Sequence, residues 1–193
     1  SFEKDACGIG MVVDSNGGSS NDIVKKGLTL LKNMAHRGAQ GADPLTSDGA
    51  GILTQIPFEL LQIQPGTAVG VLFVPQFMDL AVLQKGLQEL ALEFHLEIIG
   101  WRLVPVDSKI LGPQARQTEP LVYHIFMQPK IAMEPAAFKK KLFLFQKLSQ
   151  KKFRSYSGTR DPKTGQVLSQ FTVVSLSLET IIYKGLMLPE LLS

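Results

Sequence analysis

Helix-like and strand-like hydrophobic patterns alternate along this chain, and this alternation constrains its fold more than any other feature. Between residues 79 and 94 the apolar side chains recur every three or four positions, which predicts a helix with one apolar face. A similar stripe predicts a helix from Pro135, with Phe138, Leu142 and Phe145 facing inward and lysines facing outward. The strands that we expect are residues 7–14, 51–56, 69–74, 97–106, 121–128, 171–178 and 180–184.

A further helix is expected near the N-terminus. Residues 15–20 are rich in Gly, Asn and Ser and predict a turn, after which Asn21 can cap a helix that ends near residues 36–38. Helices and strands are therefore mixed through one core, and no repeat or linker indicates two domains. The apolar face of this first helix would consist of Val24, Leu28, Leu31 and Ala35.

Composition and charge narrow the class of protein. No apolar run approaches the roughly 18 residues that cross a bilayer, so we expect a soluble, intracellular protein, cytoplasmic or plastid, without a membrane partner. The net charge is +3, and positive residues concentrate in residues 139–160 with few aromatics between them. This distribution predicts a solvated helix face and loop rather than a nucleic-acid surface.

The chain has one cysteine, Cys7, at the head of the first predicted strand. One cysteine cannot form an internal disulfide or by itself ligate an iron–sulfur cluster, and no metal site is predicted. Gly8 and Gly10 follow it, so backbone and ligand could approach it closely. Two interpretations stay open, a nucleophile at a strand edge and a small buried cysteine in a glycine-rich strand.

A second cluster, HRGAQGADP followed by SDGAG, occupies residues 36–51. Its four glycines indicate an exposed loop that packs its backbone tightly against another segment. Arg37 could orient a carboxylate or the surroundings of a nucleophile. The alternative is a helix C-cap at Gly38 followed by turns.

Five segments spread over the chain carry a resemblance to a known family. CGIG, HRGAQGADP, SDGAGILTQIP, VPVDSKILGPQARQTEP and TIIYKGLMLPE run from Asp5 to Glu190. They occur in the same order as in the large subunit of glutamate synthase. One of them alone would be weak, but five in order are specific. The chain resembles the N-terminal part of the class II glutamine amidotransferase domain of that enzyme.

The resemblance implies an α+β fold of the N-terminal nucleophile hydrolase type. Two antiparallel sheets stack between two helical layers in that fold, an αββα four-layer sandwich, which we expect to be incomplete at the C-terminus here. Residues 1–6 resemble a leader segment, and residues 7–193 would form the N-terminal part of the amidotransferase domain.

The resemblance also implies a reaction, with Cys7 as the catalytic nucleophile and Arg37 and Gly38 lining the site. In the family this cysteine becomes the first residue when the leader is removed, and its free amine is the general base. A free thiol has a pKa of about 8.5 and is mostly protonated at neutral pH, so it needs such a base. The thiolate attacks the side-chain amide of L-glutamine, ammonia leaves, and water hydrolyses the thioester.

The implied function is ammonia release for glutamate synthesis within a longer or multi-chain glutamate synthase. The alternative is a truncated, non-catalytic interaction module. Ser1–Ala6 precede Cys7, and the family's oxyanion-hole and substrate-binding residues lie downstream of the match to residues 180–190. We therefore expect the unprocessed chain alone to be inactive and to rely on the remaining domains or a complementing chain. We expect no cofactor in this chain, because FMN and the iron–sulfur cluster belong to other domains of the parent enzyme.

Overall fold

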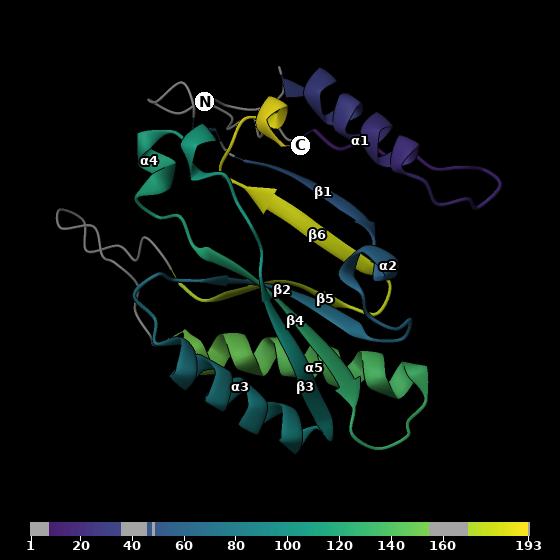
Figure 1. Cartoon of the computed structure of the whole chain (residues 1–193), viewed down its shortest axis with the longest axis vertical. Helices are drawn as coiled ribbons and strands as arrows, with labels where there is room; N and C mark the ends of the chain where they lie inside the picture. Colours follow the sequence, from purple (N-terminus) through teal and green to yellow (C-terminus); the bar gives the residue numbers. More distant parts are fainter. Residues whose placement is uncertain (1–7, 36–45, 48, 155–169, 193) are drawn as a thin grey trace, which may run out of the picture. The chain divides into compact units, whose positions relative to one another are not determined.

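The computed structural model shows a mixed α+β chain with antiparallel sheets (Figure 1). Its elements fall into two compact units, each described by itself below. One unit lies within residues 1–54, 107–117 and 183–193, and the other within residues 55–106 and 118–182. The residues that the structure describes are 8–35, 46–47, 49–154 and 170–192.

The larger unit is built on a four-stranded antiparallel sheet with the order β3-β4-β2-β5. Strand β2 is central and pairs with β4 on one side and β5 on the other, with Gly70 opposite Ile125 and opposite Leu176. β3 carries a bulge between Ile98 and Gly100. The strands are β2 (Ala68–Val74), β3 (Leu96–Leu103), β4 (Leu121–Pro129) and β5 (Thr172–Ser177).

Two helices, α3 (Leu80–Glu93) and α5 (Pro135–Phe153), cover one face of this sheet (Figure 1). The side chain of Asp79 caps α3 by accepting hydrogen bonds from the amides of Ala81 and Val82 at 2.8 and 3.3 Å. α5 begins at a proline, as the sequence predicts. Both helices are confirmed.

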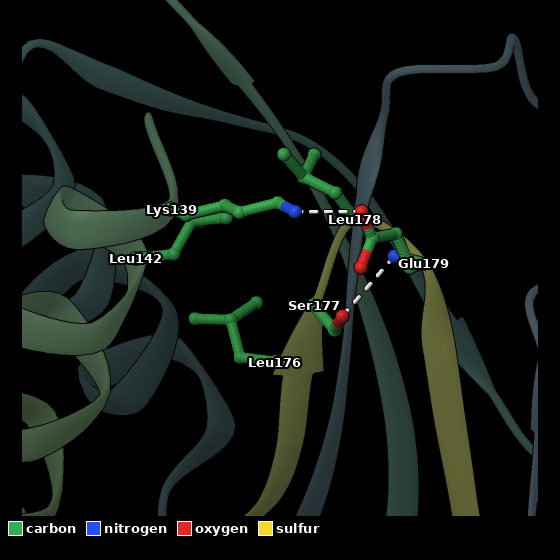
Figure 2. A pocket seen from close by; sticks show the side chains of 6 residues that line it. All are labelled: Lys139, Leu142, Leu176, Ser177, Leu178 and Glu179. Carbon is green, nitrogen blue, oxygen red and sulfur yellow. Dashed lines mark hydrogen bonds and ion pairs between the residues drawn. The ribbon is translucent and has the colours of Figure 1, made fainter. Parts of the chain in front are cut away.

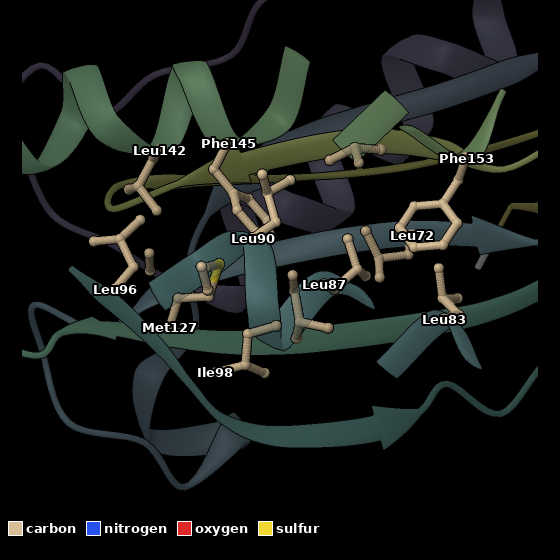
Figure 3. Close-up of a cluster of buried hydrophobic side chains, with 14 of the residues drawn as sticks. Leu72, Leu83, Leu87, Leu90, Leu96, Ile98, Met127, Leu142, Phe145 and Phe153 are labelled. Carbon is tan, nitrogen blue, oxygen red and sulfur yellow. The ribbon is translucent and has the colours of Figure 1, made fainter. Parts of the chain in front are cut away.

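The core of the larger unit lies between these helices and the sheet (Figure 3). The apolar stripe of each helix supplies one side of it, and the four strands of the sheet supply the other. Burial of this apolar surface is the main stabilising term of the unit. The labelled core residues are Leu72, Leu83, Leu87, Leu90, Leu96, Ile98, Met127, Leu142, Phe145 and Phe153.

The remaining elements are short or lie in the smaller unit. β1 and β6 form a separate two-stranded sheet, and α1 contacts η3. These elements are α1 (Asn21–Asn33), β1 (Ala50–Gln55), α2 (Phe58–Leu61), η2 (Ser108–Ile110), α4 (Pro113–Arg116), β6 (Thr180–Gly185) and η3 (Pro189–Leu191).

Helix α1 differs from its prediction at both ends. Ser20 is the N-cap, and its Oγ accepts a hydrogen bond from the amide of Ile23 at 3.4 Å, so Asn21 is already the first helical residue. The helix ends at Asn33 with Met34 as its C-cap, earlier than the predicted end near residues 36–38, and Gly38 itself lies outside the described residues. None of the 13 residues of α1, all of them described, is buried.

The strand predicted at residues 7–14 is wrong over its described part. Residues 8–14 are neither helix nor strand, and Ile9 is 98% exposed. Their alternating apolar pattern is typical of a strand, but a strand also requires a neighbour to which its backbone bonds. The strand predicted at 97–106 is confirmed only to Leu103, while the other predicted strands match within one residue at each end.

His124 on β4 is a fully buried titratable residue. It faces Val71 on one neighbouring strand and Arg102 on the other, and its Nδ1 lies 3.5 Å from Nη1 of Arg102. Burial, with a smaller contribution from the Arg102 guanidinium, lowers the pKa of His124 to about 4. The ring is therefore neutral at neutral pH.

Stability should fall as the pH drops from about 6.5 to 4, because in that range only the unfolded chain binds the His124 proton. The expected loss is roughly 3 kcal/mol, and it should level off below pH 4, where both states are protonated. Urea unfolding of the wild type and of His124→Leu at pH 7, 5 and 4 measures this. The variant should lose this part of the pH dependence, and an unchanged pH profile would contradict the assignment.

The close packing of α5 against α3 should require a glycine at the position of Gly86. A Cβ at Gly86 would lie 2.7 Å from Cζ of the buried Phe153, whereas one at Gly27 of α1 would lie 3.4 Å from Cδ1 of Ile52. Alanine gains about 1 kcal/mol of helix propensity at either site, but overpacking a core costs about 1–3 kcal/mol. Gly27→Ala should therefore stabilise the chain and Gly86→Ala should destabilise it by up to about 2 kcal/mol in urea unfolding. Equal stabilisation by both would disprove the close α3–α5 contact.

Candidate functional site

The three residues predicted for the site, Cys7, Arg37 and Gly38, lie outside the described residues. The structure does describe the segments that continue from them along the chain. These are residues 8–18, which follow Cys7, and residues 46–55, which follow the HRGAQGADP segment without residue 48. The geometry of the site is therefore built from these neighbours.

The segment after Cys7 passes helix α1 and then turns. Gly10 lies against Leu30 of α1, where a Cβ would be 2.5 Å from the leucine Cδ2, so a side chain does not fit there. At the turn, the amide of Asn16 donates to Oδ1 of Asp14 at 2.9 Å, and the amide of Gly17 donates to the Asp14 carbonyl at 3.0 Å. The interpretation of Asn16-Gly17 as turn residues is confirmed.

Ser47 connects two of the five family-like segments. Its Oγ donates a hydrogen bond to the carbonyl of Met187 at 2.7 Å and accepts one from the amide of Gly49 at 3.2 Å. The side chain is buried, so these bonds satisfy a hydroxyl that would otherwise be costly to bury. Ser47 thereby joins SDGAG to YKGLM, 140 residues further along the chain.

The glycines of SDGAG allow its backbone to touch the backbone of β6. A Cβ at Gly49, whose φ is +111°, would lie 2.8 Å from the carbonyl oxygen of Gly185. A Cβ at Gly51 would lie 2.9 Å from the carbonyl oxygen of Tyr183. The predicted close backbone packing of this region is confirmed for these two glycines, and its partner is the start of the YKGLM segment.

The segment VPVDSKILGPQARQTEP forms internal hydrogen bonds over residues 107–117. Arg116 donates from Nε to the carbonyl of Ser108 at 2.9 Å and from Nη2 to the carbonyl of Lys109 at 2.8 Å. Oδ1 of Asp107 accepts from the amide of Lys109 at 3.0 Å. Arg116 therefore holds the shape of this segment, and its guanidinium is committed to backbone carbonyls.

Three of the segments that suggested a family thus form defined local structures, and two of them meet. The family model described as "Glutamine amidotransferases class-II" matches residues 7–193. The chain belongs to the class-II glutamine amidotransferase family. The match begins at Cys7, and residues 1–6 lie outside it.

Known members that this amidotransferase chain resembles are glutamate synthases. It is 34% identical over 200 residues to the glutamate synthase [NADPH] large chain of Bacillus subtilis, covering 98% of this chain and 12% of that protein. It is 36% identical over 196 residues to the ferredoxin-dependent glutamate synthase of Pyropia yezoensis, covering 96% and 12%. It is 34% identical over 201 residues to the glutamate synthase [NADH] of Schizosaccharomyces pombe, covering 97% and 9%. The chain therefore spans about a tenth of the length of these curated relatives.

A small cleft lies elsewhere in the amidotransferase chain, between α5 and the turn that joins β5 to β6 (Figure 2). Its volume is about 220 Å³, and Lys139 Nζ bonds Glu179 Oε1 across it at 2.6 Å. Ser177 Oγ accepts from the amide of Glu179 at 3.1 Å, which fixes the turn. The cleft contains none of the predicted site residues. Its lining residues are Lys139, Leu142, Leu176, Ser177, Leu178 and Glu179.

Within the described ranges, no group of three or more His, Cys, Asp and Glu side chains is placed to hold a metal ion. No helix in that part of the chain is long and apolar enough to cross a membrane.

Sequence reasoning did not single out Ser47 or Arg116, because a serine or arginine inside a motif does not reveal which carbonyl it bonds.

Gly49→Ala should destabilise the chain more than Gly66→Ala. Both glycines have a left-handed φ, +111° and +89°, which costs an L-residue roughly 1–2 kcal/mol. Gly66 has open space around it, whereas a Cβ at Gly49 would contact the carbonyl of Gly185. We expect Gly49→Ala to lose at least about 1 kcal/mol more in urea unfolding. Equal losses for the two variants would contradict the close contact between the segments.

Proposed function

We propose that this chain is a glutaminase domain: it hydrolyses the side-chain amide of L-glutamine and supplies ammonia for glutamate synthesis within a longer or multi-chain glutamate synthase. One observation carries the proposal. The family match starts at Cys7, and glutamate synthases match 96–98% of the chain. A shared family supports the reaction type, and the names of the relatives support the fate of the ammonia.

In the proposed mechanism, the amine of Cys7 takes the proton of its own thiol. The thiolate attacks the amide carbon of glutamine, the C–N bond breaks, and the leaving nitrogen takes a proton and departs as ammonia. Water then adds to the thioester, releases glutamate and restores the thiol. Arg37 and Gly38 would line the site beside the cysteine and orient the substrate, because an arginine can hold a carboxylate with paired hydrogen bonds.

This mechanism requires the leader-like residues Ser1–Ala6 to be removed. While they remain, the nitrogen of Cys7 is part of an amide, and an amide nitrogen is not a base. Cleavage after Ala6 would generate a domain that starts at residue 7. The start of the family match at the same residue supports this boundary.

We further propose that residues 7–193 form the N-terminal part of an αββα four-layer sandwich. The four-stranded sheet with α3 and α5 on one face is consistent with one sheet layer and one helical layer. The remaining domains, or a complementing chain, would provide the oxyanion hole and the groups that bind the substrate carboxylate and amine. FMN would also belong there. So would the iron–sulfur cluster, since a single cysteine cannot ligate a cluster alone.

Labelling with a diazo-ketone analogue of glutamine tests the proposal. The full-length enzyme that contains this domain is prepared in two forms, one processed to begin at Cys7 and one that retains Ser1–Ala6. Intact-mass and peptide-mass measurements should show the adduct on Cys7 in the processed form only, because only that form has the basic amine.

Cys7→Ser is the control for the site of labelling and should take up no adduct. Iodoacetamide, which needs no amidotransferase site, establishes that Cys7 is accessible in both forms. If the processed enzyme reacts with iodoacetamide but neither takes up the glutamine analogue nor hydrolyses glutamine, the proposal is wrong. The chain would then be a non-catalytic interaction module.

A further inference from the structure

The charged residues of helix α5 are all of one sign. Its 19 residues include six lysines and no aspartate or glutamate. Its inner face is accounted for, because Phe138, Leu142 and Phe145 are buried in the core of the larger unit. The outer face therefore carries an unbalanced positive charge, independently of the proposed glutaminase reaction.

Three of the six lysines are held by neighbouring groups. Lys139 forms the ion pair with Glu179, and Lys141 donates to the carbonyl of Phe94 at 2.9 Å. Lys152 donates to the carbonyl of Gly86 at 3.1 Å and lies 3.8 Å from a carboxylate oxygen of Glu89.

The other three lysines are Lys140, Lys147 and Lys151, and none of them has an ion pair among the described residues. Their spacings of seven and four residues place them in one row along the helix, since 3.6 residues make a turn. Each of the three is exposed. The row is therefore available to carboxylates of a partner.

Apolar side chains accompany this row of lysines. Phe143, Leu144 and Leu148 are 56%, 39% and 40% exposed. Leu144 and Leu148 are four residues apart and lie on one side of the row, while Phe143 lies on the other, beneath the ammonium of Lys147 at 5.4 Å from its ring centroid. Single exposed apolar residues need no explanation, but three on one basic face form a mixed patch.

We propose that the outer face of α5 (Lys140, Phe143, Leu144, Lys147, Leu148 and Lys151) is a docking surface for an acidic amphipathic segment of another protein. Carboxylates of the partner would pair with the lysine row, and its apolar side chains would cover the two leucines and the phenylalanine. Such a helix-on-helix contact uses side chains at spacings of three and four residues on both partners.

Three other occupants fit this face less well. A membrane-bound helix has a continuous apolar face with cations at its edges, whereas here the lysines form the central row. Nucleic-acid phosphates would pair with the lysines but leave the two leucines without a partner. A second copy of the chain, with a net charge of +3 and the same basic face, would be repelled.

The test uses the whole chain and a fluorescein-labelled synthetic helix that carries Glu and Leu at spacings of three and four residues. A control peptide has Gln in place of each Glu. Fluorescence polarisation should show saturable binding of the Glu peptide, weakening with salt, and little binding of the Gln peptide. Phosphatidylcholine–phosphatidylserine vesicles and a single-stranded DNA oligonucleotide are the probes for the other occupants.

Substitution variants locate the contact. Neutralising the lysine row should weaken binding of the Glu peptide about tenfold, because three exposed ion pairs are lost together. The Leu144→Gln/Leu148→Gln variant should also weaken it, which a purely electrostatic contact would not show. The variant that neutralises the lysine row is K140Q/K147Q/K151Q on α5. Its matched control is K25Q/K32Q/K85Q on α1 and α3.

Far-UV circular dichroism should be the same for all variants, because glutamine and lysine have similar helix propensities. The proposal is supported if only the α5 variants lose binding. It is overturned if the control triple variant weakens binding equally, if the wild type does not bind the Glu peptide, or if vesicles or DNA bind the α5 face more tightly than the peptide does.

Discussion

Burial of strand β2 is the constraint on which the larger unit depends. All but one of its seven residues are buried, and it bonds to β4 on one side and to β5 on the other. A strand in this position bonds its backbone groups to a strand on each side and has no solvent face, so its neighbours must also place apolar residues toward the helices. Helices α3 and α5 then cover the face to which Ala68, Leu72 and Val74 belong.

This arrangement explains why the periodic parts of the chain were predictable. The apolar side chains from Leu83 to Ala91 and those from Phe138 to Phe145 recur at the spacing of a helix, and both sets are buried in the same core. The N-terminal segment shows the limit of the same reasoning. Ile9, Met11 and Val13 alternate as a strand would, but alternation records only which side chains can share a face. It does not provide the neighbouring strand that must accept the backbone bonds.

The candidate site also has a part that the sequence predicts and a part that it does not. Family membership rests on short segments whose residues are close in sequence, so it could be recognised before any geometry was known. The contacts between the segments could not. Ser47 bonds a carbonyl 140 residues away, and Gly49 is needed because of the carbonyl of Gly185. A close approach of two backbones depends on where both strands lie, which no local pattern encodes.

By itself, the sequence determined the helical stripes of α3 and α5, most strand positions and the family to which the chain belongs, because each depends on residue spacing or on a run of neighbouring residues. Only the tertiary structure decided that His124 is buried and neutral and that SDGAG lies against YKGLM. The same holds for the lysines of α5: three bond to a carboxylate or a backbone carbonyl, whereas Lys140, Lys147 and Lys151 have no ion pair among the described residues. These properties depend on groups that are distant in the chain, and only folding sets the distances between them.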